Sequence, residues 1–133
     1  MENESVLNSD DFNDFLDGYR ECATWCGVMV EDAVTGDFYD SDLYKVSDLS
    51  DSAIVESQKD CANFFEANLE LMQKTGNTDF SSFGHDFYLS RNGHGTGCFD
   101  RGYGKTGDEL QDAARVYGDA SLFVDNAGKL YFF

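Results

Sequence analysis

The residues best able to do chemistry are concentrated in one stretch, residues 84–107. This stretch holds both histidines, three of the nine Lys and Arg residues and seven of the thirteen glycines. A histidine beside a carboxylate can act as a general base, and an arginine can stabilise negative charge that develops in a transition state. The set would suit hydrolysis of phosphate-containing substrates, with His94 and Asp100 reacting and Arg91 assisting. The candidate groups are His85, Asp86, Arg91, Asn92, His94, Asp100 and Arg101.

The same residues also fit a structural role and a binding role. In the structural role the two carboxylates pair with the two arginines across a hairpin, and Asn92 caps its turn. No ordered Ser-His-Asp set, no Cys-His couple with an orienting group and no paired-carboxylate motif occurs, so an enzyme is the less favoured class. In the binding role the tip of the hairpin is a surface formed by Arg91, Asn92, His94, Asp100 and Arg101.

Gly102, Gly104 and Gly107 have the spacing of a dinucleotide-binding loop. That loop belongs to a βαβ unit of about 30 residues with an acidic residue further on. Only 26 residues follow Gly107 in this chain of 133, and they have the pattern of a short helix and a hairpin. We therefore interpret the glycines as a flexible turn that leads into a helix.

The four cysteines stand at positions 22, 26, 61 and 98. Zinc sites in small domains usually combine close Cys pairs with close His pairs. Here the one close pair, Cys22 and Cys26, lies on an apolar helical stripe. Cysteines of cytosolic proteins are usually reduced. The sequence therefore predicts thiols in or near the core, with no metal and no cofactor.

Apolar periodicity and turn residues predict the elements that position these groups. Apolar residues recur at helical spacing over residues 10–26, 48–74 and 106–117, whereas residues 86–101 and 122–133 have the pattern of β-hairpins. The predicted fold is α+β, with two N-terminal helices packed on a small antiparallel sheet and a third helix between two β-hairpins. One domain spans the whole chain, and its first eight residues are expected to be frayed.

Polar residues mark where the first two helices begin. Ser9 and Asp48 are predicted N-caps, because a side-chain oxygen there accepts a bond from an unpaired backbone N–H. Residues 28–47 contain a short extended piece and then an acidic, turn-rich loop. The aromatic residues Phe38, Tyr39 and Tyr44 in this loop are expected to pack against the rest of the protein.

The net charge of −17 is distributed unevenly. Residues 1–75 contain 18 acids and 4 bases, a net charge of −14, and residues 76–133 contain 8 acids and 5 bases, a net charge of −3. Such a surface repels nucleic acid and attracts basic proteins. The excess of acidic residues either keeps the protein soluble or forms a surface that imitates nucleic acid. The acidic surface is predicted to comprise Asp10, Asp11, Asp14, Asp17, Asp37, Asp40 and Asp42.

The sequence lacks the signals of a membrane or secreted protein. No apolar run approaches the roughly 20 residues of a membrane span. The N-terminus, MENESVLNSDD, has neither the basic region nor the apolar core of a signal peptide. The expected location is the cytoplasm.

Residues 85–102 and the segments that follow them resemble a family of small, uncharacterised bacteriophage and prophage proteins. The family core is similar to D-F-[WY]-L-T-R-N-G-H-G-x-G-F-W-D-R, followed by a helix and a final hairpin. The chain departs from this core at three positions: Cys98 and Phe99 stand where the family has Phe-Trp, and Ser90 stands where it has Thr. The resemblance extends over about residues 50–133. The matching residues are Asp86, Phe87, Tyr88, Leu89, Arg91, Asn92, Gly93, His94, Gly95, Gly97, Asp100 and Arg101.

The resemblance implies a setting rather than an activity, because small acidic phage proteins often act on host proteins. The leading expectation is an accessory protein that binds a host or phage protein, and one form of this expectation is inhibition of a nucleic-acid-handling defence factor through a DNA-like acidic surface. One alternative is a small hydrolase that uses His94 and Asp100. Another is a structural subunit that dimerises through the edge of its C-terminal hairpin.

Overall fold

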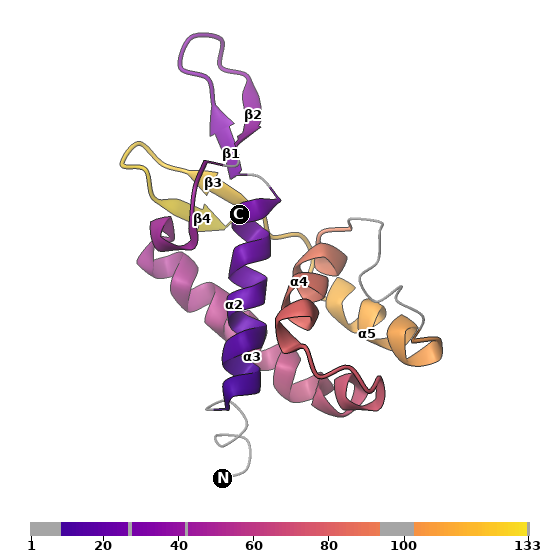
Figure 1. Ribbon diagram of the computed structural model, residues 1–133. Coiled ribbons are helices and arrows are strands. Elements are labelled where there is room, and N and C mark those ends of the chain that lie inside the picture. Colours follow the sequence, from indigo (N-terminus) through magenta and orange to yellow (C-terminus); the bar gives the residue numbers. More distant parts are fainter. Residues whose placement is uncertain (1–8, 27, 42, 94–102, 133) are drawn as a thin grey trace.

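The computed structural model describes residues 9–26, 28–41, 43–93 and 103–132. Within these ranges the chain is α+β, as predicted, with four α-helices and a four-stranded sheet (Figure 1). The elements are, in chain order, α2 (Asp10–Trp25), β1 (Val28–Glu31), β2 (Phe38–Ser41), the 3-10 turn η1 (Val46–Asp48), α3 (Asp51–Lys74), α4 (Phe80–Arg91), α5 (Lys105–Arg115), β3 (Leu122–Val124) and β4 (Leu130–Phe132).

Helix α2 begins as predicted. The Ser9 hydroxyl accepts a hydrogen bond from the Phe12 amide at 3.2 Å, and two aspartates occupy the first turn, where the helix dipole favours negative charge. One face of the helix is buried, and its apolar members are Phe12, Phe15, Leu16, Tyr19, Cys22 and Ala23. Through this face α2 packs against both α3 and α4.

Helix α3 begins two residues later than its predicted cap. Ser50, not Asp48, is the N-cap, and its hydroxyl accepts from the Ala53 amide at 3.1 Å. Asp48 instead closes the turn η1 by accepting from the Lys45 amide at 2.9 Å. The shift lets Leu49 enter the core, where it is 4% exposed and bridges to Leu130 of β4.

Residues 86–90 form part of helix α4, so the predicted strand there is wrong. Asp79 caps the helix by accepting from the Ser82 amide. The apolar residues Phe80, Phe83 and Phe87 recur at helical spacing and are all buried. The partner strand predicted at 98–101 lies outside the described residues. The hairpin predicted over residues 86–101 is therefore wrong in its first strand, and the hairpin that the structure shows before α3 is β1–β2.

Helices α2 and α4 pack with their backbones in contact. A Cβ on Gly84 would overlap the Phe15 carbonyl and lie 2.7 Å from the Tyr19 amide nitrogen. A Cβ on Gly18 would overlap Ser81 in the same way. Gly84 is therefore a packing residue inside helix α4.

An aromatic cluster joins three helices at the core. Phe64 of α3 stacks on Phe87 of α4 with ring centroids 4.2 Å apart, and Phe15 of α2 lies 6.0 Å from both rings. Offset stacks of this kind contribute about 0.5–1.5 kcal/mol beyond the area they bury. The helices thus pack mainly on one another, not on the face of a sheet.

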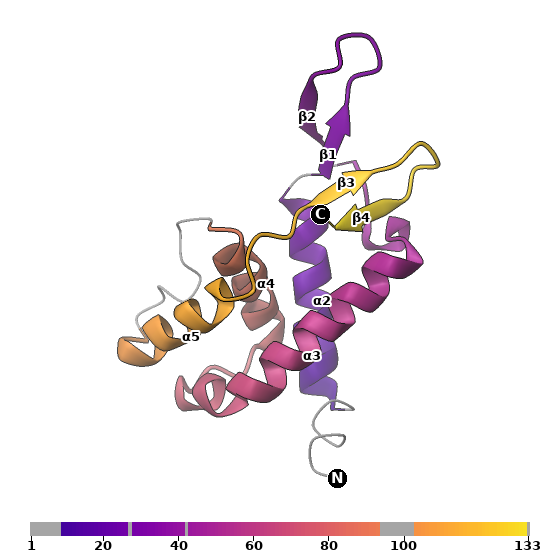
Figure 2. The ribbon, with the colours of Figure 1, turned by 180° about the vertical axis from the view of Figure 1, so that it is seen from behind.

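The sheet is mixed rather than antiparallel, with the strand order β2-β1-β3-β4. The predicted C-terminal hairpin is confirmed as β3–β4, but β1 pairs with β3 in parallel through Met29 and Phe123. The sheet stands at the C-terminal end of α2, and the β1–β2 hairpin extends away from the helices (Figures 1 and 2). Val28, Leu122 and Leu130 connect the sheet to the core.

Two buried tyrosines predict a loss of stability at alkaline pH. Burial raises the pKa of Tyr19 and of Tyr88 well above the ordinary value of about 10. The unfolded chain therefore releases these protons first, and stability falls once the pH rises above about 10, by about 1.4 kcal/mol per pH unit for each tyrosine. Urea unfolding midpoints across this range measure the slope. Tyr19→Phe and Tyr88→Phe should each flatten it, and slopes equal to that of the wild type would contradict the prediction.

Candidate interaction surface

An exposed stripe of four acids runs along α2. Asp10, Asp14, Asp17 and Glu21 follow one another at spacings of four, three and four residues, which places them on one side of the helix. All four are exposed, and Asp11 is exposed beside them. We call Asp10, Asp14, Asp17 and Glu21 the acidic stripe. Asp10, Asp14 and Asp17 belong to the predicted acidic surface, whereas Glu21 does not, although its position four residues after Asp17 was a usable signal.

Arg20, the one base of α2, interacts with the charge of Asp17 but directs its hydrogen bonds to α3. Its Nε donates to the Ser57 hydroxyl and its Nη2 to the Ile54 carbonyl, both at 2.9 Å. Arg20 is the sole basic residue between Asp10 and Trp25. The exposed side of α2 therefore carries a net negative charge, which the single positive charge of Arg20 offsets only in part.

The charge density of the stripe approaches that of one nucleic-acid strand. At a rise of about 1.5 Å per residue, successive acids stand about 4.5–6 Å apart along the helix axis. A single strand of DNA carries one charge per about 3.4 Å. A surface that binds phosphates would therefore meet a comparable row of negative charges on α2.

The predicted acids Asp37 and Asp40 belong to the β1–β2 hairpin, which extends beyond the C-terminal end of α2 (Figure 1). Asp37 is exposed, Asp40 lies in strand β2, and Asp42 lies outside the described residues. The structure thus separates these acids from Asp10, at the N-terminal end of the stripe, instead of joining all of them in one surface.

Two details of this hairpin differ from the expectation of a packed loop. Phe38 and Tyr39 are 63% and 53% exposed. Asp32 holds the turn by accepting from the amides of Val34 and Thr35 at 2.8 and 3.0 Å. The bonds from Thr35 and Val34 lower the pKa of the Asp32 carboxyl. Phe38 and Tyr39 are therefore exposed on strand β2 beside a locally held turn, whereas Tyr44 is partly buried and packs against the core as expected.

Arg91 ends helix α4 inside the protein, not at the tip of a hairpin. It is 6% exposed. Its Nη1 donates to Asp60 at 2.8 Å and to the Tyr19 hydroxyl at 3.0 Å, while Nε and Nη2 donate to the carbonyls of Gly118 and Tyr117. Burial opposes the positive charge, but Tyr19 and Asp60 outweigh it and raise the pKa of Arg91. A partner could reach this guanidinium only by displacing one of these bonds.

Asn92 caps the end of α4 and holds the segment before β3. Its Nδ2 donates to the Tyr88 carbonyl at 2.9 Å, and its Oδ1 accepts from the Ala120 amide at 2.8 Å. This agrees with the capping role considered for it, although the cap closes a helix rather than a hairpin. Asn92 and Arg91 together connect α4 to the C-terminal third of the chain.

Of the remaining predicted site residues, the structure describes His85 and Asp86. His85 faces α2, with its Nε2 at 4.0 Å from a Glu21 oxygen and its ring against Trp25. Asp86 is buried in α4 at 1% exposure. The predicted residues His94, Asp100 and Arg101 lie outside the described residues. Gly104 is the N-cap of α5, which agrees with the interpretation of this glycine as a turn leading into a helix.

No family model, curated protein or solved structure matches this chain. None of the helices in the described ranges is long and apolar enough to cross a membrane. The described residues also contain no group of three or more His, Cys, Asp or Glu that could hold a metal ion. The geometry of the site itself therefore carries the functional argument.

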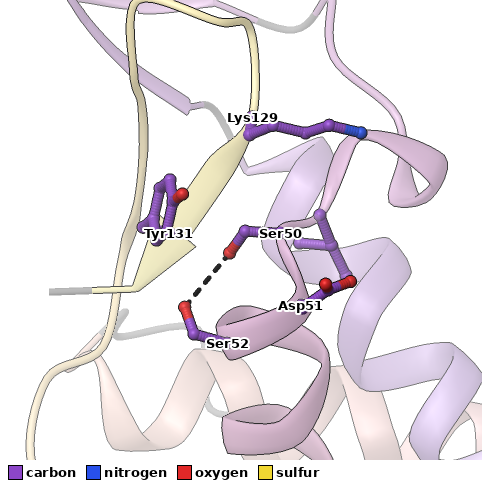
Figure 3. A pocket seen from close by; sticks show the side chains of 6 residues that line it. Ser50, Asp51, Ser52, Lys129 and Tyr131 are labelled. Atoms are coloured by element: carbon purple, nitrogen blue, oxygen red, sulfur yellow. Dashed lines mark hydrogen bonds between the residues drawn. The ribbon is translucent and has the colours of Figure 1, made fainter.

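A hollow of about 280 Å³ lies where the N-terminus of α3 meets β4 (Figure 3). The Ser50 and Ser52 hydroxyls are 3.3 Å apart, and Asp51 and Lys129 bring opposite charges to its rim. The Ser50 oxygen already caps the helix, and Asp51 opposes an anion there. The hollow contains none of the predicted site residues, so the acidic stripe remains the better candidate.

Proposed function

We propose that this protein is a phage-type accessory protein that binds a basic, nucleic-acid-handling protein in the host cytoplasm. The observation that carries the proposal is the acidic stripe, four exposed carboxylates on one side of a helix whose sole arginine is bonded elsewhere. The resemblance of residues 85–102 to phage proteins supplies the setting. The effect on the partner would be inhibition, because the stripe would occupy its phosphate-binding surface.

Charge determines the class of partner. A chain with a net charge of −17 repels nucleic acid and speeds its encounter with a basic surface. Helix α2 is well suited to present the charges, because its other face is fixed in the core by Phe15 and Tyr19, which are 0% and 1% exposed. The carboxylates therefore stand on a rigid element and lose little backbone freedom on binding.

Binding is favoured over hydrolysis by the position of Arg91. The hydrolase hypothesis assigned this residue to stabilise negative charge on a substrate. Its guanidinium already forms four hydrogen bonds inside the protein, one of them to Asp60. Arg91 thus holds the fold together, and the acidic stripe faces the solvent.

Capture of partners from bacterial lysate with the tagged protein tests the proposal. We expect a basic nucleic-acid-binding protein to be retained at about 0.05 M salt and released at about 0.5 M, where the Debye length is only a few ångströms. Short duplex DNA should displace the same protein, because the two compete for one phosphate-binding surface. Retention of the same partner at both salt concentrations and in the presence of DNA would overturn the proposal, as would the absence of any stoichiometric partner.

A further inference from the structure

Two thiols meet at the C-terminal end of α2. Cys26 is the C-cap residue and is exposed, whereas Cys22, one turn earlier, is 0% exposed. Their sulfur atoms are 3.5 Å apart and share a hydrogen bond. The pair therefore combines one accessible sulfur with one protected sulfur at contact distance.

The environment favours the thiolate at Cys26. The hydrogen bond from Cys22 lowers the pKa of Cys26 to about 7. The carbonyl end of a helix disfavours negative charge, so this bond is what stabilises the thiolate there. Cys61 has the opposite character, because it is 0% exposed and burial raises its pKa. A redox-sensing cysteine is typically accessible, ionised at neutral pH and adjacent to a second thiol that resolves it.

We propose that Cys26 and Cys22 form a peroxide-sensitive thiol pair, in which Cys26 is oxidised first and Cys22 then closes a disulfide. In the first step the Cys26 thiolate attacks one peroxide oxygen, forms an S–O bond and releases hydroxide. In the second step the Cys22 sulfur loses its proton, attacks the Cys26 sulfur and expels the second hydroxide. Two thiols and one hydrogen peroxide thus give one disulfide and two waters.

Closing the disulfide requires the last turn of α2 to change. Residues four apart on a helix have Cβ atoms about 5–6 Å apart, whereas a disulfide needs about 3.5–4.5 Å. Cys26 is held to the helix by its amide, which donates to the Cys22 carbonyl at 2.8 Å. Strand β1 begins two residues after Cys26, at Val28.

The lone tryptophan of the chain, Trp25, lies at this end of the helix and reports the change. Its side chain is 72% exposed and its ring contacts His85. Treatment of the full-length protein with hydrogen peroxide should shift the Trp25 emission, and a dithiol reductant should reverse the shift. Peptide mapping without reduction should find Cys22 linked to Cys26, with Cys61 still a thiol.

Variants distinguish the cysteine that is oxidised first from the cysteine that closes the disulfide. Cys22→Ala removes the proposed resolving thiol, so dimedone should label Cys26 in this variant and not in the wild type. Alkylation of Cys26 at pH 7 should also slow about threefold, because thiolate is lost about sixteenfold and nucleophilicity gained about fivefold. Cys61→Ala is the matched control, and it should form the same disulfide as the wild type.

The outcomes that would overturn the proposal are distinct. For the wild-type protein, the proposal is overturned if Cys22 and Cys26 stay reduced under peroxide, or if the disulfide that forms joins other cysteines. For Cys22→Ala, the proposal is overturned if dimedone does not label Cys26, or if Cys26 is alkylated at the wild-type rate. The mapping of the wild-type protein decides the proposal even where a variant folds poorly.

Discussion

Replacing Gly84 with alanine should lower the free energy of unfolding by about 3 kcal/mol, the upper end of the usual cost of overpacking a core. The added methyl group would overlap the Phe15 carbonyl and lie 2.7 Å from the Tyr19 amide nitrogen. Both are backbone atoms of α2, which cannot turn aside as a side chain can. The two helices must separate, and the aromatic cluster behind them loses its packing. Urea unfolding followed by circular dichroism measures the change.

Ser82→Ala, on the same helix, is the matched control for this substitution. It adds no atoms at the α2 contact, so it should change stability by no more than about 0.5 kcal/mol. Gly18→Ala, on the facing helix, should resemble Gly84→Ala, because it would press on Ser81. A Gly84→Ala protein as stable as the wild type would show that α2 and α4 do not pack with their backbones in contact.

Arg91→Lys should destabilise the protein by about 3 kcal/mol, although it keeps the charge. A lysine ammonium cannot reproduce the fork that binds Asp60, the Tyr19 hydroxyl and two carbonyls at once. Each buried acceptor left without its donor costs about 1–3 kcal/mol. The lysine amine would also lose the contacts of the guanidinium with the rings of Phe87 and Tyr117.

Arg115→Lys tests whether the effect belongs to the site rather than to the substitution. Arg115 is exposed in the last turn of α5, where either cation suits the helix dipole. This variant should therefore unfold within about 0.5 kcal/mol of the wild type. If both variants lost an equally small amount of stability, Arg91 would not be a structural residue and would again be a candidate binding residue.

The helices whose apolar stripes are continuous were predictable from sequence. Phe12, Phe15 and Tyr19 mark α2 without interruption, and the C-terminal hairpin is marked by its Asp125–Gly128 turn. Helix α4 was not predictable in the same way. Gly84 suggested a break, and Phe87 and Leu89 happened to alternate over a few residues. The apolar period that favours a helix starts earlier, at Phe80.

The arrangement of the sheet depends on contacts between residues far apart in the chain. β1 meets β3 through Met29 and Phe123, and nothing in either segment encodes a parallel partner. The β1–β2 hairpin did carry a local signal. Asp32 and Gly36 stand where a turn needs a side-chain acceptor and a positive φ, which is +76° at Gly36. The acidic character of the segment led us to predict a loop instead.

The candidate site was predictable only where it depends on local spacing. Asp10, Asp14 and Asp17 share one side of a helix whose phase is fixed by its apolar residues, so their exposure followed from the sequence. The burial of Arg91 did not, because its partners Asp60 and Tyr19 lie in other helices. A basic residue within a polar, glycine-rich motif has the same sequence pattern whether it holds a fold or a ligand.

The most direct test of the account compares two variants with the same net charge. One removes the acidic stripe, and its substitutions are Asp10→Asn, Asp14→Asn, Asp17→Asn and Glu21→Gln. The other removes four exposed acids of α3 and α5, and its substitutions are Glu66→Gln, Glu70→Gln, Glu109→Gln and Asp112→Asn. We would measure the affinity of each for the protein captured from lysate at low salt, after confirming by circular dichroism that both are folded.

Loss of the stripe should weaken binding by at least about fourfold and by as much as several hundredfold, because four surface charge pairs each contribute about 0.2–1 kcal/mol. The control should weaken it by less than about threefold, since it changes only the long-range attraction. Equal losses in the two variants would contradict the account. The interaction would then depend on the total charge of the protein and not on the row of carboxylates along α2.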